Sequence, residues 1–251
     1  MTQTTPALLS DLQSQRFARQ ISLPAIGEAG QRKLLDGSVL VVGAGGLGSP
    51  VCLYLAAAGV GRIGIVDGDS VDLSNLQRQI MHYTFDIGRL KTESAQSKLS
   101  AIFPEIVVQV HNFFADDNNL VAILSGYDVV VDATDSLQAK FMLNRVCARH
   151  GKPLVHGGID GFGGEVLTIS PKASSCYECA YRKPDTFVVP KRRGPLGPVP
   201  GIIGSIQAIE CLKLLVGIGA PLYNTLFIID TLGMHSRKFT VPRRPDCPAC
   251  S

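Results

Sequence analysis

Short apolar runs and helix-like patterns alternate along the first 150 residues of the chain. The strand-like runs lie at 38–42, 62–66, 106–110 and 127–131. The helix-like stretches lie at 46–58, 91–102 and 136–150. Alternation of this kind predicts βαβ units with a parallel sheet. Right-handed crossovers then place helices on both faces of that sheet.

The second half of the chain has a different pattern. Strand-like runs lie at 153–156, 164–169, 225–230 and 236–241. They are joined by glycine-rich turns and by one long helix at about 201–217. We expect these strands to extend the same sheet in mixed or antiparallel orientation. Because no Ser/Gly linker separates the halves, the prediction is a single Rossmann-like α/β domain. Its parts are a helical segment over 1–36, the alternating half over 37–150 and the second half over 151–251.

Composition narrows the class of protein. Of the 251 residues, 45% are hydrophobic and 18% are charged, which indicates a folded globular chain. The net charge of +3 gives no argument for a nucleic-acid partner. The longest uncharged stretch, 37–61, contains seven glycines and Pro50, so it is interpreted as strand, turn and helix rather than a membrane span. The N-terminus lacks a basic start followed by an apolar core, so we expect no signal peptide and a cytoplasmic protein without a membrane partner.

A glycine-rich loop follows the run at 38–42. Gly43 permits a tight turn from strand to helix, Gly45 lets the backbone approach a phosphate, and Gly48 lets the helix pack on the strand. Free N–H groups at the helix N-terminus then favour an anion. Asp67, at the end of the next run, is placed to accept hydrogen bonds from ribose hydroxyls. The pattern predicts an adenine nucleotide but leaves NAD and ATP open, with a glycine turn that binds nothing as the structural alternative.

Four polar residues favour a triphosphate over a dinucleotide. Arg78 and Lys91 supply two cations that neutralise phosphates, and Asp135 lies at a strand end where it can hold Mg²⁺. Asn75 can bond a phosphate oxygen or orient Arg78. Taken singly, these residues are equally consistent with surface arginine, helix-start lysine and N-cap roles. Together they provide what a triphosphate needs.

The chain has seven cysteines, and four of them form two Cys-x-x-Cys pairs, Cys176/Cys179 and Cys247/Cys250. Thiolates paired in this way suit tetrahedral Zn²⁺, and a set of four leaves no open position for water. A structural zinc site is therefore predicted. The alternative is a pair of redox-active motifs, but neither pair opens a thioredoxin-like βαβ pattern. The remaining cysteines fall in helical patterns and are predicted to be core residues: Cys52, Cys147 and Cys211.

Several motifs occur together in one order and spacing. They are Arg16-Phe17-Ala18-Arg19-Gln20, Gly43-Ala44-Gly45-Gly46-Leu47-Gly48, Asp67, Ser74-Asn75-Leu76-Gln77-Arg78-Gln79, Lys91, Asp132-Ala133-Thr134-Asp135 and both Cys-x-x-Cys pairs. By these motifs the chain resembles, over nearly its whole length, the adenylyltransferases related to ubiquitin-activating enzymes in the bacterial MoeB/ThiF/HesA group. The resemblance implies ATP-dependent activation of the C-terminal Gly-Gly carboxylate of a small ubiquitin-like sulfur-carrier protein. An acyl-adenylate forms and pyrophosphate leaves.

The resemblance also implies roles for individual residues. The implied ATP-binding residues are Gly43, Gly45, Gly46, Gly48, Asp67, Asn75, Arg78 and Lys91, and the implied catalytic residues are Arg19, Arg78, Lys91 and Asp135. Asp67 binds the ribose, and Asp135 binds Mg²⁺ or steers the α-phosphate. Arg19 reaches the nucleotide of the neighbouring subunit, which requires a homodimer with two shared sites. The carrier carboxylate is already a nucleophile, so catalysis needs charge relief and in-line placement rather than a general base.

The chain departs from part of the family at one loop. Family members that form a thioester or persulfide carry a cysteine after the first Cys-x-x-Cys pair, whereas residues 181–201 contain none. We therefore expect the enzyme to stop at the adenylate and to pass it to an external sulfide or persulfide donor. The chain ends one residue after Cys250, so no additional C-terminal rhodanese module is expected.

Two segments are candidates for contacts with the carrier. Segment 183–200 has five prolines and the basic cluster 191–193, which predicts an exposed loop, either a plain connector or one that attracts the carrier. The glycine-rich segment 156–164 is a candidate wall for the carrier's tail, with a bulged strand and a turn as the alternative. His156 within it is predicted to be packed rather than catalytic.

Two other functions remain to be weighed against carrier activation. An NAD(P)-dependent oxidoreductase would need a proton relay and a nicotinamide site, and the sequence shows no such constellation. An inactive zinc-stapled scaffold would bind the carrier without activating it, but the intact Arg78, Lys91 and Asp135 argue against that. The sequence does not separate molybdopterin, thiamin, tRNA-thiolation and other sulfur pathways.

Overall fold

The computed structural model describes residues 8–171, 173–182, 184 and 194–251. Its strands form one eight-stranded sheet in the order β3-β2-β1-β4-β5-β6-β7-β8. Their bounds are β1 (Ser38–Val42), β2 (Arg62–Val66), β3 (Val107–His111), β4 (Val129–Asp132), β5 (Leu154–Asp160), β6 (Gly163–Ile169), β7 (Thr225–Asp230) and β8 (His235–Thr240). Strands β1 to β5 pair in parallel, and β6, β7 and β8 continue the sheet antiparallel. The predicted fold class is confirmed.

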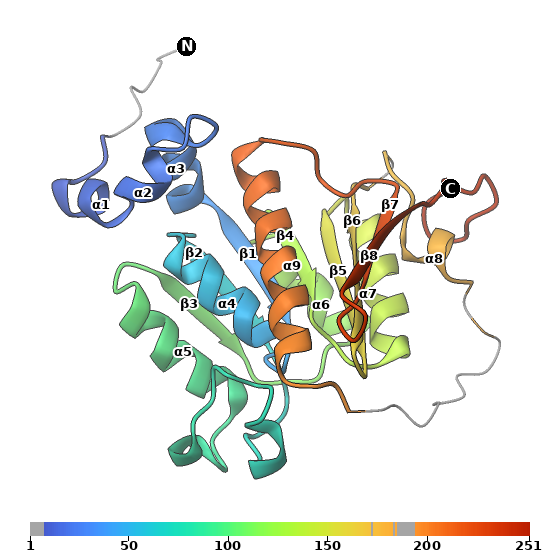
Figure 1. Cartoon of the computed structure of the whole chain (residues 1–251), viewed down its shortest axis with the longest axis horizontal. Coiled ribbons are helices and arrows are strands. Elements are labelled where there is room, and N and C mark those ends of the chain that lie inside the picture. The colour runs from blue at the N-terminus through green and yellow to red at the C-terminus, as the bar shows by residue number, and fades with distance from the viewer. Residues whose placement is uncertain (1–7, 172, 183, 185–193) are drawn as a thin grey trace.

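Helices cover both faces of the sheet (Figure 1). Their bounds are α1 (Asp11–Arg16), α2 (Ala18–Ile21), α3 (Gly27–Asp36), α4 (Gly48–Ala57), α5 (Lys91–Ile102), α6 (Asp117–Leu124), α7 (Leu137–Arg149), α8 (Tyr177–Ala180) and α9 (Pro198–Val216). Alternate residues of β1 separate the two cores: Val39 and Val41 pack with α4, α5 and α9. Leu40 and Val42 pack with α6 and α7. This period of two buries every residue of β1 and explains its continuous apolar run.

The long helix α9 begins earlier than its sequence pattern predicts. It starts at Pro198, inside the segment that was predicted to be a loop, so that prediction is wrong for 198–200. Proline is tolerated in a first helical turn, because the backbone N–H that it lacks has no partner there in any case. Residues 194–197 are non-helical, whereas 183 and 185–193, with the basic cluster, lie outside the described residues.

One helix of the described chain, α9, has the length and apolar composition of a membrane span. Half of it is buried inside the protein. It packs against α4 and against strands β5 and β6. Its apolar character is therefore explained by its place in the core.

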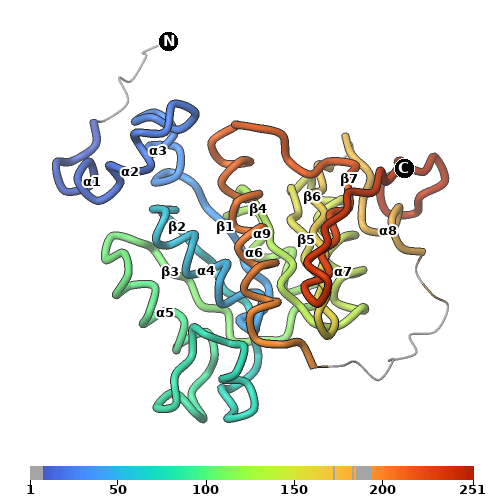
Figure 2. Tube along the Cα trace, in the orientation of Figure 1, coloured from blue at the N-terminus to red at the C-terminus, as the bar shows by residue number. Residues whose placement is uncertain are grey.

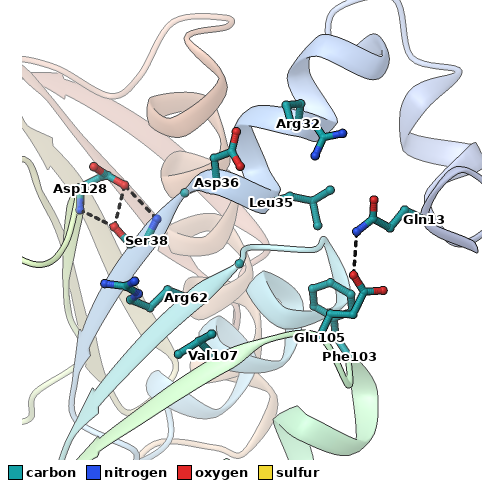
Figure 3. A pocket seen from close by; sticks show the side chains of 12 residues that line it. Gln13, Arg32, Leu35, Asp36, Ser38, Arg62, Phe103, Glu105, Val107 and Asp128 are labelled. Carbon is teal, nitrogen blue, oxygen red and sulfur yellow. Dashed lines mark hydrogen bonds between the residues drawn. The ribbon is translucent and has the colours of Figure 1, made fainter. Parts of the chain in front are cut away.

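The N-terminal helices lie at the amino ends of the parallel strands (Figure 2). A cavity of about 520 Å³ separates them from the sheet there (Figure 3). Gln13 Nε2 donates to Glu105 Oε2 at 2.7 Å across this cavity, and Asp128 accepts hydrogen bonds from both the backbone N–H and the hydroxyl of Ser38. These bonds fasten α1 and the start of β1 at the end of the sheet opposite to the carboxyl ends of its parallel strands.

Candidate nucleotide and metal sites

A cavity of about 750 Å³ lies at the carboxyl ends of β1, β2, β4 and β5. The strand order reverses between β1 and β4, and ligands of open α/β sheets bind at such a point. The volume is in the range of small-molecule sites. The sequence-predicted residues that line the cavity are Gly43, Gly45, Gly46, Asp67, Arg78, Lys91 and Asp135.

The glycine loop forms the floor of this cavity, and two of its glycines are required by the backbone. Gly43 has φ +104°, and a Cβ there would lie 2.6 Å from the carbonyl oxygen of Ala133. A Cβ on Gly48 would lie 1.9 Å from the carbonyl oxygen of Gly43. Gly48 therefore acts through packing of α4 and does not line the cavity, as its predicted packing role requires.

Asp67 braces the glycine loop. Its Oδ2 accepts from the backbone N–H of Ala44 at 2.7 Å, and its Oδ1 accepts from the N–H of Asp69 at 2.8 Å. Each carboxylate oxygen keeps a second lone pair, so the group can still accept hydrogen bonds from a ligand in the cavity.

Two cations face the glycine loop. Lys91 is 6% exposed, and its Nζ lies 2.8 Å from Asp69 Oδ2. It is the first residue of α5, where the helix dipole disfavours a positive charge. A buried lysine at the first position of a helix goes against this preference, and such exceptions are typical of functional sites. Arg78 donates from Nη1 to the carbonyl oxygen of Ser74 at 3.0 Å, which aligns its guanidinium along the cavity.

Besides Gly48, two predicted residues lie outside the cavity lining. Asn75 Oδ1 accepts from the backbone N–H of Asp72 at 3.3 Å and caps a short 3₁₀ helix, Leu73–Asn75. Asn75 thus shapes the turn that carries Arg78. Arg19 lies on α2, which lies beside the amino ends of the parallel strands (Figure 1), whereas the cavity lies at their carboxyl ends and does not include Arg19 in its lining.

Sequence reasoning missed a buried polar chain behind Asp135. Lys140 Nζ lies 3.2 Å from Asp132 Oδ2, and the same oxygen lies 2.8 Å from His156 Nδ1. His156 Nε2 is 3.3 Å from Glu165 Oε1, and Tyr181 donates its hydroxyl proton to Glu165 Oε2. His156 is packed, as predicted, but it also bridges two carboxylates. The only sequence signal was that Lys140 stands directly before Phe141, a buried apolar residue of α7.

Neighbouring positive charges and hydrogen bonds decide whether the buried carboxyls of Asp132 and Glu165 are ionised. Burial alone would raise the pKa of the Asp132 carboxyl, but Lys140 and the hydrogen bond from His156 outweigh burial and hold the pKa below its ordinary range. Glu165 follows the same rule: burial raises its pKa, and the contacts with His156 and Tyr181 lower it further than burial raises it. Both carboxyls therefore stay ionised around neutral pH.

Gln79 is a second residue that the sequence did not single out. It is 4% exposed and lines the cavity beside Gly45. Its Oε1 is buried and has no hydrogen-bond partner among the described residues. A buried, unpaired amide oxygen is costly, so its position at the cavity wall indicates a ligand contact.

The segment 156–164 is a regular hairpin. Strands β5 and β6 pair in seven consecutive antiparallel pairs, from Leu154↔Ile169 to Asp160↔Gly163. The strand therefore has no bulge, whereas the turn of the structural alternative is present at 161–162. The role of the segment as a wall for the carrier's tail stays a prediction. Gly158, Gly163 and Gly164 line the same cavity as the glycine loop. We name two parts of this lining: the nucleotide lobe has Gly43, Gly45, Gly46, Asp67, Arg78 and Lys91, and the second lobe has Gly158, Gly163 and Gly164.

The four paired cysteines meet in one cluster. The sulfur atoms of Cys176, Cys179, Cys247 and Cys250 all lie within 4.8 Å of one another. The Cys176–Cys179, Cys176–Cys247 and Cys179–Cys250 distances are 3.9, 3.5 and 3.6 Å. Zn–S bonds of about 2.3 Å in a tetrahedron require sulfur atoms about 3.8 Å apart. The cluster therefore fits a tetrahedral metal ion. The C-terminal segment that carries Cys247 and Cys250 lies beside α8 (Figure 2).

N–H donors surround the cluster. Asn144 Nδ2 donates to Cys176 Sγ at 3.6 Å, and the backbone N–H of Arg244 donates to Cys179 Sγ at 3.5 Å. Such donors orient thiolate ligands and stabilise their charge. The other cysteines are buried core residues, as predicted: Cys52, Cys147 and Cys211. Burial raises the pKa of the Cys52 and Cys147 thiols to about 12, so neither is a nucleophile near neutral pH.

Known proteins with the same sequence pattern identify the class. A family model described as the ThiF family matches residues 17–249. The sulfur carrier protein adenylyltransferase of Thermus thermophilus is 43% identical over 243 residues, which are 94% of this chain and 90% of that protein. The SAMP-activating enzyme E1 of Haloferax volcanii is 42% identical over 96% of this chain and 90% of its own length. The chain spans about half (51%) of adenylyltransferase and sulfurtransferase MOCS3-1 of Zea mays, at 42% identity.

Solved structures give the same fold. A crystal structure of E. coli MccB with MccA-N7isoASN superposes with a TM-score of 0.83 over 96% of this chain and 75% of that chain, at 22% identity. The nucleotide loop, the cationic cavity and these relatives define the class as an adenylyltransferase. The chain belongs to the ThiF family. The resemblance inferred from the motifs is confirmed.

Proposed function

We propose that this chain uses ATP to adenylate the C-terminal Gly-Gly carboxylate of a small ubiquitin-like sulfur-carrier protein, with release of pyrophosphate. The observation that carries the proposal is the two-lobed cavity. One lobe contains the glycine loop and the cations Arg78 and Lys91, and the other runs along the β5–β6 hairpin. Asp135 follows β4, which lies between β1 and β5 in the sheet, so one ligand can present an α-phosphate and a second can present a carboxylate to it.

In the nucleotide lobe, Asp67 receives the ribose hydroxyls, and Arg78 and Lys91 offset the charge of the triphosphate. Asn75 acts by shaping the turn that carries Arg78. Asp135 is exposed at the cavity and is the proposed protein ligand of Mg²⁺. Bound Mg²⁺ would supply charge neutralisation at the phosphates. The residues themselves contribute fixed positions and positive potential, which suits a reaction whose nucleophile needs no base.

The second lobe is proposed to hold the carrier tail in an extended conformation. Gly158, Gly163 and Gly164 present backbone without side chains there, so a Gly-Gly tail can lie close to the wall. Gly164 also has a packing reason, since a Cβ would lie 2.3 Å from Ile203. Gly163 has no such contact closer than 3.5 Å. Packing therefore explains the glycine at 164 but not the glycine at 163, so Gly163 gives the stronger support for a carrier tail that lies against this wall.

Zinc is the proposed occupant of the four-cysteine cluster. The sulfur spacing and the N–H donors fit a closed structural site, which leaves no position for a reacting water. Its proposed role is to hold the C-terminal segment and α8 against the body. Tyr177 on α8 lines the cavity, so this support reaches the site.

Several further features belong to the same proposal. Arg19 acts on the nucleotide of the neighbouring subunit of a homodimer, in the cytoplasm. Because residues 181–201 contain no cysteine, the reaction ends at the adenylate, and an external sulfide or persulfide donor then attacks it. The carrier's pathway is not specified by these residues.

The NAD(P) oxidoreductase remains the alternative from another enzyme class. Both nucleotides would use the glycine loop, but only ATP carries a triphosphate whose charge Arg78 and Lys91 would offset. A thermal shift with ATP and Mg²⁺ that is absent with NAD separates the two functions. An inactive scaffold predicts a carrier complex without turnover.

The direct test is intact-mass analysis of a Gly-Gly carrier after incubation with the protein, ATP and Mg²⁺. The proposal expects a carrier with one added adenylate. A carrier lacking its two terminal glycines is the matched control and should stay unmodified. An unmodified Gly-Gly carrier, for every carrier of a broad panel, contradicts the proposal.

A further inference from the structure

Lys140 is a buried cation in the lining of the cavity. It is the fourth residue of α7, is 5% exposed and lines the cavity. Its Nζ lies 2.8 Å from the carbonyl oxygen of Thr134, 2.6 Å from that of Gly157 and 3.2 Å from Asp132 Oδ2. An ammonium has three protons, and these three acceptors use all of them. Lys140 therefore has no proton left to donate to a phosphate.

The two carbonyl acceptors lie on different sides of the reaction site. Thr134 leads directly into Asp135, in the turn at the nucleotide lobe. Gly157 is on β5, next to Gly158 in the second lobe. The backbone pairing of β4 with β5 ends at Asp132↔His156. Beyond that pair, the Lys140 ammonium bridges the turn that contains Thr134 and strand β5 at Gly157.

The buried carboxylate of Asp132 balances the charge of Lys140. Asp132 is 1% exposed and also accepts a hydrogen bond from Thr134 Oγ1 at 2.7 Å. Its second oxygen is held by His156 at 2.8 Å. Because the carboxylate is fixed from both sides, the ammonium is held in place rather than free to follow a ligand.

We propose that Lys140 is a positioning residue, which sets the separation between the Asp135 turn and the β5 wall and so the approach of the carrier carboxylate to the α-phosphate. This inference rests on the proposed adenylation. A displacement of 1 Å at a reacting centre lowers rates by about 100-fold. Loss of the bridge thus lowers kcat, while ATP and the carrier keep their own binding contacts.

The test compares Lys140→Met with Lys140→Arg in a steady-state adenylation assay. We expect kcat of Lys140→Met to fall by roughly 30-fold or more, with KM for ATP and for the carrier within about threefold of wild type. Arginine keeps the charge and several donors, so Lys140→Arg should recover most of the lost kcat. Lys152→Met is the matched control, because Lys152 Nζ bonds the carbonyl oxygen of Tyr127 at 2.6 Å, away from the cavity. Its kcat should be that of wild type.

Removing one partner of a buried ion pair destabilises proteins, so Lys140→Met is also made with Asp132→Asn. The double variant removes both charges, and its melting temperature should return toward wild type while kcat stays low. A folded Lys140→Met with wild-type kcat overturns the inference. So does a double variant whose kcat recovers with its stability, since charge balance alone would then explain the loss. A wild type that forms no adenylate overturns the proposed function and the inference together.

Discussion

Arg145 donates hydrogen bonds to both carboxylate oxygens of Glu178, with Nε 2.6 Å from Oε1 and Nη2 3.0 Å from Oε2. Glu178 is on α8, between the metal-site residues Cys176 and Cys179, and its side chain is 2% exposed. Arg145 is on α7, the helix whose first turns carry Lys140. This ion pair therefore connects the cysteine cluster to the helix that carries Lys140 into the lining of the 750 Å³ cavity.

We expect Glu178→Gln to lower the free energy of unfolding by about 1–3 kcal/mol, because the partly exposed Arg145 guanidinium loses its charged partner and the buried position 178 loses a two-point hydrogen bond. A loosened α8 should also release metal to a chelator faster than wild type. Chemical denaturation and chelator kinetics measure the two effects. Asp117→Asn is the matched control, since Asp117 and Arg149 form an exposed pair at 3.9 Å. Its effect should stay below about 1 kcal/mol, and equal effects of the two substitutions would contradict the connection.

Purified protein should contain about one Zn²⁺ per chain, as one closed four-thiolate site requires. Cys247→Ser should lose the metal and lower the melting temperature, because the C-terminal segment is released from α8. Cys211→Ala removes a buried thiol outside the cluster and should keep its metal. Elemental analysis with thermal melting measures both variants. A fully folded wild type without bound metal would refute the zinc site.

Histidine 82 makes stability depend on pH. His82 Nε2 donates to the carbonyl oxygen of Ala44 in the glycine loop at 2.8 Å, and Nδ1 lies 2.9 Å from Ser94 Oγ. Burial holds the pKa of His82 below its ordinary value of 6.5. Below that value the unfolded chain binds a proton that the folded chain does not, so stability is lost as pH falls from about 7 toward 5. Melting curves across this range should show the loss.

The loss of stability on acidification should be smaller in His82→Gln than in wild type. His150→Gln replaces an exposed histidine and serves as the control. If His82→Gln and His150→Gln lose stability on acidification as steeply as wild type does, His82 is not the group responsible.

The distance between Arg19 and the cavity of its own chain leads to a subunit-mixing experiment. Arg19→Ala and Asp135→Ala should each be inactive as homodimers. Mixed dimers should regain about one working site of two, because one site then receives an intact Arg19 and an intact Asp135. Activity is measured after verified subunit exchange. No recovery would mean that Arg19 acts within its own chain or not at all.

The sequence predicted those elements whose boundaries depend on local patterns. Strands β1, β2 and β7 and helix α5 have the bounds that the apolar runs predicted. Helix α6 was not predicted, although Asp116 and Asn119 form a capping box at its start, because it has only eight residues. The glycine loop and the cysteine cluster were predicted since each depends on fixed spacings.

The partners of buried polar residues were not predictable in the same way. Asp132 lies 24 residues from His156, and Lys140 reaches a carbonyl on another strand. Only the folded sheet brings these groups together, so no periodicity in the sequence reports them. Asn75 shows the converse case: its motif was recognised, but its side chain caps its own turn rather than lining the cavity.

The central claim is that this cavity transfers the adenylyl group of ATP to a carrier carboxylate with release of pyrophosphate, and ATP–pyrophosphate exchange tests it most directly. Wild-type protein should exchange labelled pyrophosphate into ATP only when a carrier ending in Gly-Gly is present. Lys91→Met removes a cation from the cavity lining and should lower that exchange by about 100-fold or more. Folded, metal-loaded wild-type protein that shows no carrier-dependent exchange with any member of a broad panel of Gly-Gly carriers would contradict the account.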